Sequence, residues 1–193
     1  MSGIKRRAAL AACAALLLAA CATTPSAVAP APAVTIERTF DSGGRLSARR
    51  GDEAIAVHFT WRHAPDRDDF DVATPLGQIV ARMQRDATGV RVERPGEPMV
   101  AHSSWSALTT AVLGVPLPVE GLVAWIQGAP VDAARADLER DGVGRPDVLR
   151  EQGWEIVYTY ADAGSRPSRL VMRYPGAEVI EVRIVVDRWS TPS

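Results

Sequence analysis

The stretch AIAVHFTW, residues 54–61, alternates large apolar side chains with small or polar ones. This period of two is that of a β-strand, in which successive side chains point to opposite faces of the sheet. One face of the strand carries the four residues Ile55, Val57, Phe59 and Trp61. The pattern predicts a strand that covers an apolar interior with one face and meets water with the other.

The same alternation recurs along most of the chain. It is found in residues 69–73, 79–84, 89–93, 154–160, 170–172 and 180–186. Turn-forming pairs such as Pro95-Gly96 and Pro175-Gly176 separate these runs. Short alternating strands with such turns are typical of an antiparallel meander. Segment 131–150 matches no motif, and its strands are not assigned from the sequence.

Two helices are predicted in the middle of the chain. Apolar residues spaced by three and four in residues 105–113 form one helical face, which Ser103 or Ser104 can cap and Gly114 can end. A second apolar stripe runs through residues 119–126. Short helices inserted in a meander predict an α+β fold in which the helices lie over one face of the sheet.

The N-terminus predicts export. Three basic residues at positions 5–7 precede an apolar run, residues 8–20, that is too short to span a bilayer. The run ends in Leu18-Ala19-Ala20-Cys21, which resembles the lipobox of bacterial lipoproteins. That resemblance implies cleavage before Cys21, with an S-diacylglyceryl and an N-acyl group on this cysteine and no other cofactor. The alternative is an ordinary signal peptide that happens to contain a cysteine.

These features divide the chain into three parts. Residues 1–20 form the signal peptide, residues 21–37 a lipidated N-terminus and flexible proline-containing tether, and residues 38–193 a single domain. Loss of the signal removes three basic residues and no acids, so the formal charge goes from −1 to −4. This charge, without a basic block, gives no footprint for nucleic acid. The mature chain keeps one of the two cysteines, which excludes an intramolecular disulfide.

The sequence contains no set of residues with the spacing of a known catalytic site. It has three histidines, His58, His63 and His102, and none has a partner at metal-ligand spacing. No Gly-x-Ser-x-Gly elbow is present, and no nucleophile and base can be paired. The acidic cluster at Asp66, Asp68, Asp69 and Asp71 lacks the spacing of a calcium loop, so we expect a solvated turn and strand face there. We therefore predict neither an enzyme nor a metal site.

An apolar residue occupies one predicted turn. Leu76 lies between Pro75 and Gly77, where polar residues are usual. Its side chain either folds back to pack or projects into a partner or a membrane. A buried leucine contributes about 1.5–3 kcal/mol, which can bias how a tethered domain touches a bilayer.

A series of short motifs then follows in a fixed order. They are Gly44-Arg45-Leu46-Ser47, Phe59-Thr60-Trp61, Thr74-Pro75-Leu76-Gly77, Leu113-Gly114-Val115-Pro116-Leu117-Pro118, Leu122-Val123-Ala124-Trp125-Ile126-Gln127-Gly128, Gln152-Gly153-Trp154 and Val186-Asp187-Arg188-Trp189. Together with the lipobox, this order resembles the LolB family of outer-membrane lipoprotein receptors. The resemblance runs from about Phe40 to Trp189.

The resemblance implies an incomplete antiparallel β-barrel of about 10–11 strands, with short helices covering an apolar cavity. It implies a monomer that is lipid-anchored in the outer membrane and faces the periplasm. Such a protein takes lipoproteins from the carrier LolA and inserts them into the inner leaflet of that membrane without nucleotide hydrolysis. Ala22, after the lipidated cysteine, fits this location because the family's sorting logic reserves aspartate there for the inner membrane. The alternative is a half-barrel lipoprotein that binds another apolar ligand, a lipid or a glycolipid.

Site residues follow from the resemblance and from the predicted faces. The Pro75-Leu76-Gly77 turn matches the family's membrane-delivery loop. Eight residues are candidates to line the acyl-chain cavity or its helical lid: Ile55, Val57, Phe59, Trp61, Ile79, Leu122, Val123 and Ile126. If carrier docking follows charge complementarity, the candidates are the predicted exposed arginines Arg45, Arg49 and Arg82.

Overall fold

An antiparallel sheet organises residues 35–161 and 164–192, the part of the chain that the computed structural model describes. Its strands are β1 (Phe40–Arg50), β2 (Glu53–Ala64), β3 (Arg67–Ala73), β4 (Ile79–Asp86), β5 (Gly89–Glu93), β6 (Val100–His102), β7 (Asp137–Arg140), β8 (Pro146–Glu151), β9 (Trp154–Thr159), β10 (Arg169–Tyr174) and β11 (Ile180–Ser190). The predicted signal peptide, Cys21 and the tether as far as residue 34 lie outside the described residues.

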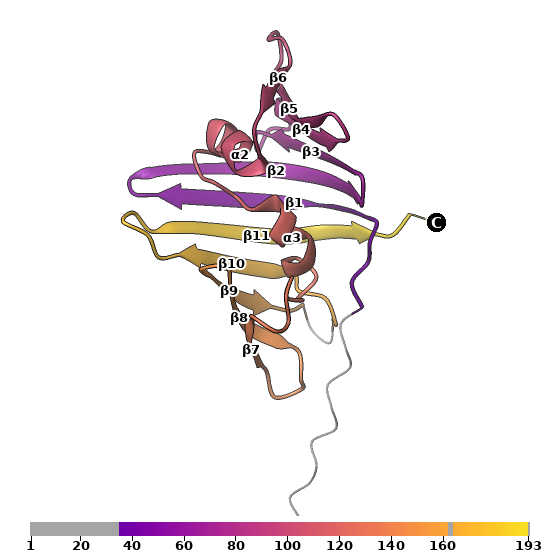
Figure 1. Ribbon diagram of the computed structural model, residues 1–193, viewed down its shortest axis with the longest axis vertical. Helices are drawn as coiled ribbons and strands as arrows, with labels where there is room; N and C mark the ends of the chain where they lie inside the picture. Colours follow the sequence, from indigo (N-terminus) through magenta and orange to yellow (C-terminus); the bar gives the residue numbers. More distant parts are fainter. Residues whose placement is uncertain (1–34, 162–163, 193) are drawn as a thin grey trace, which may run out of the picture. The chain divides into compact units, whose positions relative to one another are not determined.

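The sheet consists of two meanders. They are joined where β1, the first strand of the chain, pairs with β11, the last. The eleven described strands lie in the order β6-β5-β4-β3-β2-β1-β11-β10-β9-β8-β7 (Figure 1). The first and last strands pair from Asp41 opposite Ser190 to Arg50 opposite Ile180. The sheet does not close, because β6 and β7 are its two edges. The predicted incomplete barrel of 10–11 strands is confirmed.

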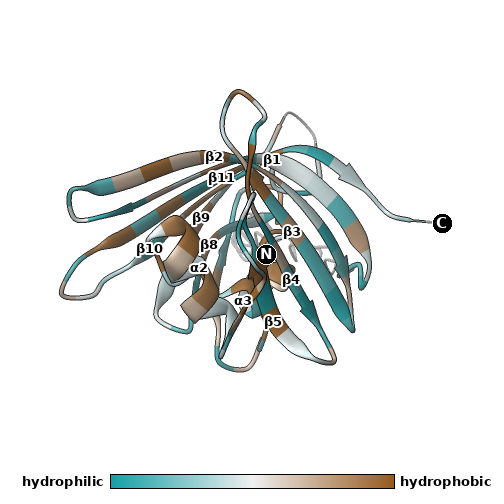
Figure 2. Cartoon of the chain, turned by 90° about the horizontal axis from the view of Figure 1, so that it is seen from above, coloured by the Kyte–Doolittle hydropathy of each residue, from teal (hydrophilic) through white to brown (hydrophobic). Residues whose placement is uncertain are grey.

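Both predicted helices are present and connect the two meanders. They are α2 (Trp105–Leu113) and α3 (Val119–Trp125). Figure 2 shows that the sheet curls and that both helices lie on its hollow side, between the wings formed by β3–β5 and β8–β10. We call the face toward the helices the inner face and the opposite one the outer face.

The inner face is apolar because the period of two is kept along the strands. In β2, Val57, Phe59 and Trp61 are buried, whereas His58 and Thr60 on the outer face are exposed. The inner residues of the long strands and the buried residues of both helices form one hydrophobic cluster. The face assignment made from the sequence is therefore confirmed for β2.

The ends of α2 follow the predicted capping. The Ser104 hydroxyl accepts a hydrogen bond from the Ala107 backbone N–H at 3.1 Å, so Ser104 is the N-cap of α2. Gly114 ends this helix in a left-handed conformation with φ of 74°, which glycine adopts without strain. Beyond it, the Thr109 hydroxyl accepts a bond from the Leu117 backbone N–H at 2.8 Å, which fixes the connection to α3.

One side chain of the acidic cluster is buried, contrary to the prediction of a solvated face. Asp68 is 2% exposed and accepts hydrogen bonds from Trp61 Nε1 at 2.9 Å and Arg85 Nε at 2.6 Å. Its other contact is His63 Nδ1 at 2.7 Å. Burial alone would raise the pKa of this carboxyl, but the hydrogen bonds, led by that of His63, lower it overall. The alternation along β3 places Asp68 on the inner face. The prediction considered only the neighbouring acidic residues, which do not reveal that Trp61 and Arg85 bind this carboxylate.

Segment 131–150, unassigned from the sequence, contains the edge strand β7 and most of β8. The four residues of β7 are Asp-Leu-Glu-Arg, and only Leu138 packs against the hydrophobic cluster. A polar edge strand of this length carries almost no periodic signal, because only one of its faces holds an apolar residue.

A β-bulge between Gly43 and Gly44 generates the first prediction. A Cβ atom built on Gly44 would lie 1.9 Å from the backbone oxygen of Val185, so any side chain there would push β1 from β11. We expect Gly44→Ala to lower the free energy of unfolding by about 1–3 kcal/mol, measured by urea denaturation. The control is Gly142→Ala, since a Cβ at Gly142 meets no atom within 4 Å. Equal stability of both variants would contradict the prediction.

Candidate functional site

The inner face brings most of the predicted cavity residues together. Val57, Phe59 and Trp61 from β2 lie in one hydrophobic cluster with Leu122 and Ile126, which belong to α3 and the residue after it. Two further candidates, Ile55 and Val123, are partly buried and pack against this cluster. Ile79, at the start of β4, is partly exposed and is not among the residues of that cluster or those packed on it.

A buried carboxylate holds the end of α3. Glu151, at the end of β8, is 5% exposed and accepts a hydrogen bond from Trp125 Nε1 at 2.6 Å. It also accepts bonds from the backbone N–H groups of Val131 at 2.9 Å and Asp132 at 2.7 Å. The carboxylate therefore joins the last helical residue to the chain that leaves the helix. Charge-assisted bonds of this kind are about twice as strong as neutral ones.

A second anchor joins the same region to the start of the domain. Gln127 is 3% exposed, and its Oε1 accepts a bond from the Glu37 backbone N–H at 2.7 Å. Its Nε2 donates to the backbone oxygens of Glu37 at 3.1 Å and Val123 at 3.0 Å. All three partners of this amide are backbone groups, two of them at Glu37 and one at Val123. Gln127 therefore fixes the position of the chain at Glu37.

The Glu37 carboxylate is itself fully bonded. It accepts hydrogen bonds from Thr191 Oγ1 at 2.7 Å, Trp189 Nε1 at 2.8 Å and Arg166 at 2.7 Å. The bond from Thr191 is the main cause of the lowered pKa of this carboxyl, and those from Trp189 and Arg166 add to it. The chain thus joins the sheet and α3 at Glu37, the last residue that the sequence assigned to the tether. The boundaries of the signal peptide and tether remain predictions.

The turn between β3 and β4 projects its apolar residue. Leu76 is 91% exposed. The turn beneath it is ordered by backbone bonds from Gly77 N to the Thr74 oxygen and from Thr74 N to the Gln78 oxygen, both at 2.8 Å. Gly77 has φ of 85°, a left-handed value that favours glycine. Of the two positions expected from the sequence, packed or projecting, the Leu76 side chain takes the projecting one.

The described residues show neither a metal-binding cluster nor a spanning helix. No group of three or more His, Cys, Asp or Glu side chains among them could hold a metal ion. No helix within residues 35–161 and 164–192 is long and apolar enough to cross a membrane. The candidate site consists of an apolar interior, its helical cover and an exposed leucine.

Sequence reasoning missed Glu37 and Glu151. Both are charged residues next to apolar runs, and their partners lie 90 and 26 residues away along the chain. The signal that could have found Glu151 is its place at the end of β8 on the inner face, where a charge requires a partner.

The anchor at Glu151 generates the second prediction. Glu151→Ala would leave the Trp125 indole N–H buried without an acceptor, so we expect a loss of at least about 2 kcal/mol in the free energy of unfolding. The control is Glu139→Ala, which removes an exposed ion pair with Arg150 and should cost less than about 1 kcal/mol. Urea denaturation followed by tryptophan fluorescence measures both. A Glu151→Ala variant as stable as the control would show that the carboxylate does not hold α3.

The family model and two relatives that match this chain carry the same family description. The family model "Outer membrane lipoprotein LolB" matches residues 38–189. The outer-membrane lipoprotein LolB of Thiobacillus denitrificans is 35% identical over 189 residues, which cover 96% of this chain and 98% of that protein. The LolB of Chromobacterium violaceum is 37% identical over 179 residues, covering 91% of this chain and 94% of that protein.

Among solved structures, a LolA superfamily protein from Nitrosomonas europaea matches with a TM-score of 0.47 and 9% identity, over 83% of this chain and 89% of that one. The family model and the relatives confirm the predicted class of lipoprotein, its location in the outer membrane and the prediction that it is not an enzyme. The family match, which covers the described sheet and both helices, shows that this chain belongs to the LolB family of outer-membrane lipoproteins.

Proposed function

We propose that this protein accepts the acylated N-terminus of a lipoprotein from a LolA-type periplasmic carrier and inserts it into the inner leaflet of the outer membrane, without nucleotide hydrolysis. Lipid on Cys21 would anchor it there as a monomer that faces the periplasm. The main support is an inner face that is apolar along the long strands and is covered by two short helices.

An apolar interior suits this task energetically. Each methylene group of an acyl chain gains about 0.8 kcal/mol when it leaves water. A lipoprotein therefore cannot cross the aqueous periplasm unshielded, and it moves from one acceptor to the next only if the next binds the chains better. In this scheme the inner face is the acceptor between the carrier and the bilayer, and the bilayer binds the chains most strongly. No nucleotide is needed because the affinities alone set the direction.

In this proposal the helices move when acyl chains enter. Ile55 lines a pocket of about 190 Å³ together with Val112, Leu113 and Val115, at the C-terminal end of α2. Pockets that bind small ligands usually measure about 300–1,000 Å³, so this one is too small for a triacylated group. Leu122 and Ile126 are at most 1% exposed against the sheet. On loading they would exchange contact with the sheet for contact with acyl chains, so little apolar surface would reach water.

Two polar atoms in the interior also fit a lipid ligand. The indole N–H of Trp105 and the hydroxyl of Tyr158 are buried, and neither makes a hydrogen bond within the described part of the chain. Burial raises the pKa of the Tyr158 hydroxyl, so this group stays protonated and able to donate. Ester and amide carbonyls of the acylated terminus are acceptors of the required kind.

Transfer of a labelled client tests the proposal. A chain of residues 22–193, which lacks the lipid, is mixed with a LolA-type carrier loaded with a labelled lipoprotein and no ATP. We expect the label to be found on this chain at equilibrium. If the label stays on the carrier while circular dichroism shows a folded chain, the proposal is wrong, and a half-barrel that binds a free lipid or glycolipid becomes the better hypothesis. Mass spectrometry of co-purifying lipids would then identify the ligand.

The projecting leucine generates a separate prediction for delivery. Leu76→Glu should leave the free energy of unfolding within about 0.5 kcal/mol, because the side chain is 91% exposed. It should still accept the client but release it into vesicles several-fold more slowly, since a charged turn cannot enter the apolar layer.

The matched control for this variant is Val143→Glu. Val143 is a 72% exposed apolar residue in the turn between β7 and β8. Delivery by the Val143→Glu protein should equal that of the wild type. Unfolding of the Leu76→Glu protein would show that Leu76 packs in the core, and equal delivery by both variants would exclude a role of the β3–β4 turn.

A further inference from the structure

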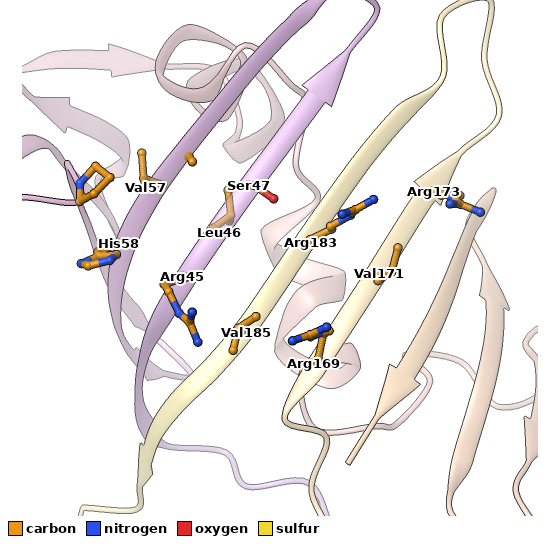
Figure 3. A pocket seen from close by; sticks show the side chains of 12 residues that line it. Arg45, Leu46, Ser47, Val57, His58, Arg169, Val171, Arg173, Arg183 and Val185 are labelled. Carbon is orange, nitrogen blue, oxygen red and sulfur yellow. The ribbon is translucent and has the colours of Figure 1, made fainter. Parts of the chain in front are cut away.

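The outer face of the sheet carries a groove that the proposed transfer of acyl chains does not use. It has a volume of about 570 Å³ and crosses β10, β11, β1 and β2 (Figure 3). Four arginines line it, Arg45, Arg169, Arg173 and Arg183, and no acidic residue does. Pro75, the neighbour of the exposed Leu76, also lines it. The cationic groove is thus continuous with the membrane-delivery turn.

The strand register explains the shape of the groove. Ser47 pairs with Ala56 on one side and with Arg183 on the other, and Arg183 in turn pairs with Val171. Ala56, Ser47 and Val171 in this row have small or β-branched side chains. The floor of the groove is therefore low and largely apolar. The adjacent row places Val185 between Arg45 and Arg169, and Figure 3 shows these three side chains on neighbouring strands.

The charge of the groove is not balanced by its neighbours. Arg45 pairs with Asp187 at 2.9 Å, and Arg173 and Arg183 share Glu181 at 2.9 and 2.6 Å. Among the described residues, Arg169 has no hydrogen-bond or ion-pair partner. Four guanidinium groups therefore face two carboxylates, which leaves two positive charges beside an apolar floor. Such a surface complements an anion that carries apolar groups.

We propose that this outer-face groove docks on the membrane surface by binding the phosphate of an anionic phospholipid headgroup. The proposal rests on the proposed function in one respect, namely that Leu76 meets the membrane. A guanidinium group binds phosphate with two parallel hydrogen bonds, which a flexible point charge cannot match. The apolar floor at Val171 and Val185 suits the glycerol and upper acyl region of a lipid. We favour a lipid over a polyanionic protein because an apolar floor and an exposed leucine lie beside the arginines, as glycerol and acyl groups lie beside a phosphate.

Docking through the groove would orient the domain. With the phosphate among the arginines, the neighbouring turn at Pro75 brings Leu76 to the same membrane surface. Each arginine near an anionic surface contributes about fivefold to the affinity, and salt weakens the effect. The lipid on Cys21 holds the protein near the bilayer, whereas the groove selects which face meets it.

The test is arginine footprinting of the mature, lipid-anchored protein in two kinds of vesicle. One contains phosphatidylcholine alone, and the other phosphatidylcholine with phosphatidylglycerol. Phenylglyoxal modification of each arginine is followed by peptide mass spectrometry. We expect Arg169 and Arg183 to be modified about fivefold more slowly on the anionic vesicles. Arg135 and Arg140, near β7, should react equally on both, since only the groove is protected.

A double variant and a matched control check the assignment. Arg169→Gln with Arg183→Gln should abolish the protection of the remaining groove residues, Arg45 and Arg173, without changing the unfolding temperature. Arg135→Gln with Arg140→Gln removes the same charge elsewhere and should leave that protection intact. If the double groove variant is protected like the wild type, the proposal is overturned.

Three other outcomes would also overturn it. Equal modification on both vesicles would mean that the groove does not meet anionic lipid. Protection by inorganic phosphate alone, on phosphatidylcholine vesicles, would indicate a site for a free ion. Protection that requires the carrier would make the groove a protein-docking surface. The footprint needs neither carrier nor client, so its failure would leave the proposed transfer standing, and failure of transfer would leave a positive footprint valid.

Discussion

The apolar inner face of an unclosed sheet is the constraint on which the rest of the structure depends. A closed barrel would bury that face by itself, but here β6 and β7 remain edges, so the face would meet water without a cover. The helices α2 and α3 supply that cover with side chains such as Leu108 and Leu122, which are at most 1% exposed. Because the cover is a separate element from the sheet, it can in principle be exchanged for another apolar body of similar size.

Polar contacts add to the apolar packing of the cover where α3 ends. Glu151 binds Trp125 at the end of α3, and Gln127 binds the backbone at Glu37, where the chain joins the domain. The Glu37 carboxylate in turn binds Trp189 on β11. At the other end of α3, the Thr109 hydroxyl binds the Leu117 backbone N–H, and between these two ends the helix packs through apolar side chains.

The two faces of the same strands have opposite chemistry. In β1, Leu46 faces the interior and Arg45 the outside, and β11 repeats this with Ile184 and Arg183. The inner face suits acyl chains and the outer face suits phosphate. The β3–β4 turn, with Leu76 exposed, borders the outer groove through Pro75. The proposed transfer and the proposed docking would use the two faces separately, and alternation provides both within one sheet.

The sequence by itself determined the features that have a local period. The strands and faces around residues 54–61, the helix that Gly114 ends and the turn around Leu76 all depend on residues within a few positions of one another. The structure decided that Ser104 rather than Ser103 caps the helix and that Leu76 projects. The motif order and the lipobox also indicated the family.

The tertiary structure alone decided the pairing of β1 with β11, the burial of Asp68, the anchors at Glu37 and Glu151, and the row of arginines on the outer face. The pair Trp189 and Glu37 is 152 residues apart, and Arg45 and Asp187 are 142 apart. Such contacts arise only when strand order and register are fixed by the burial of the whole inner face, and no local pattern carries that information.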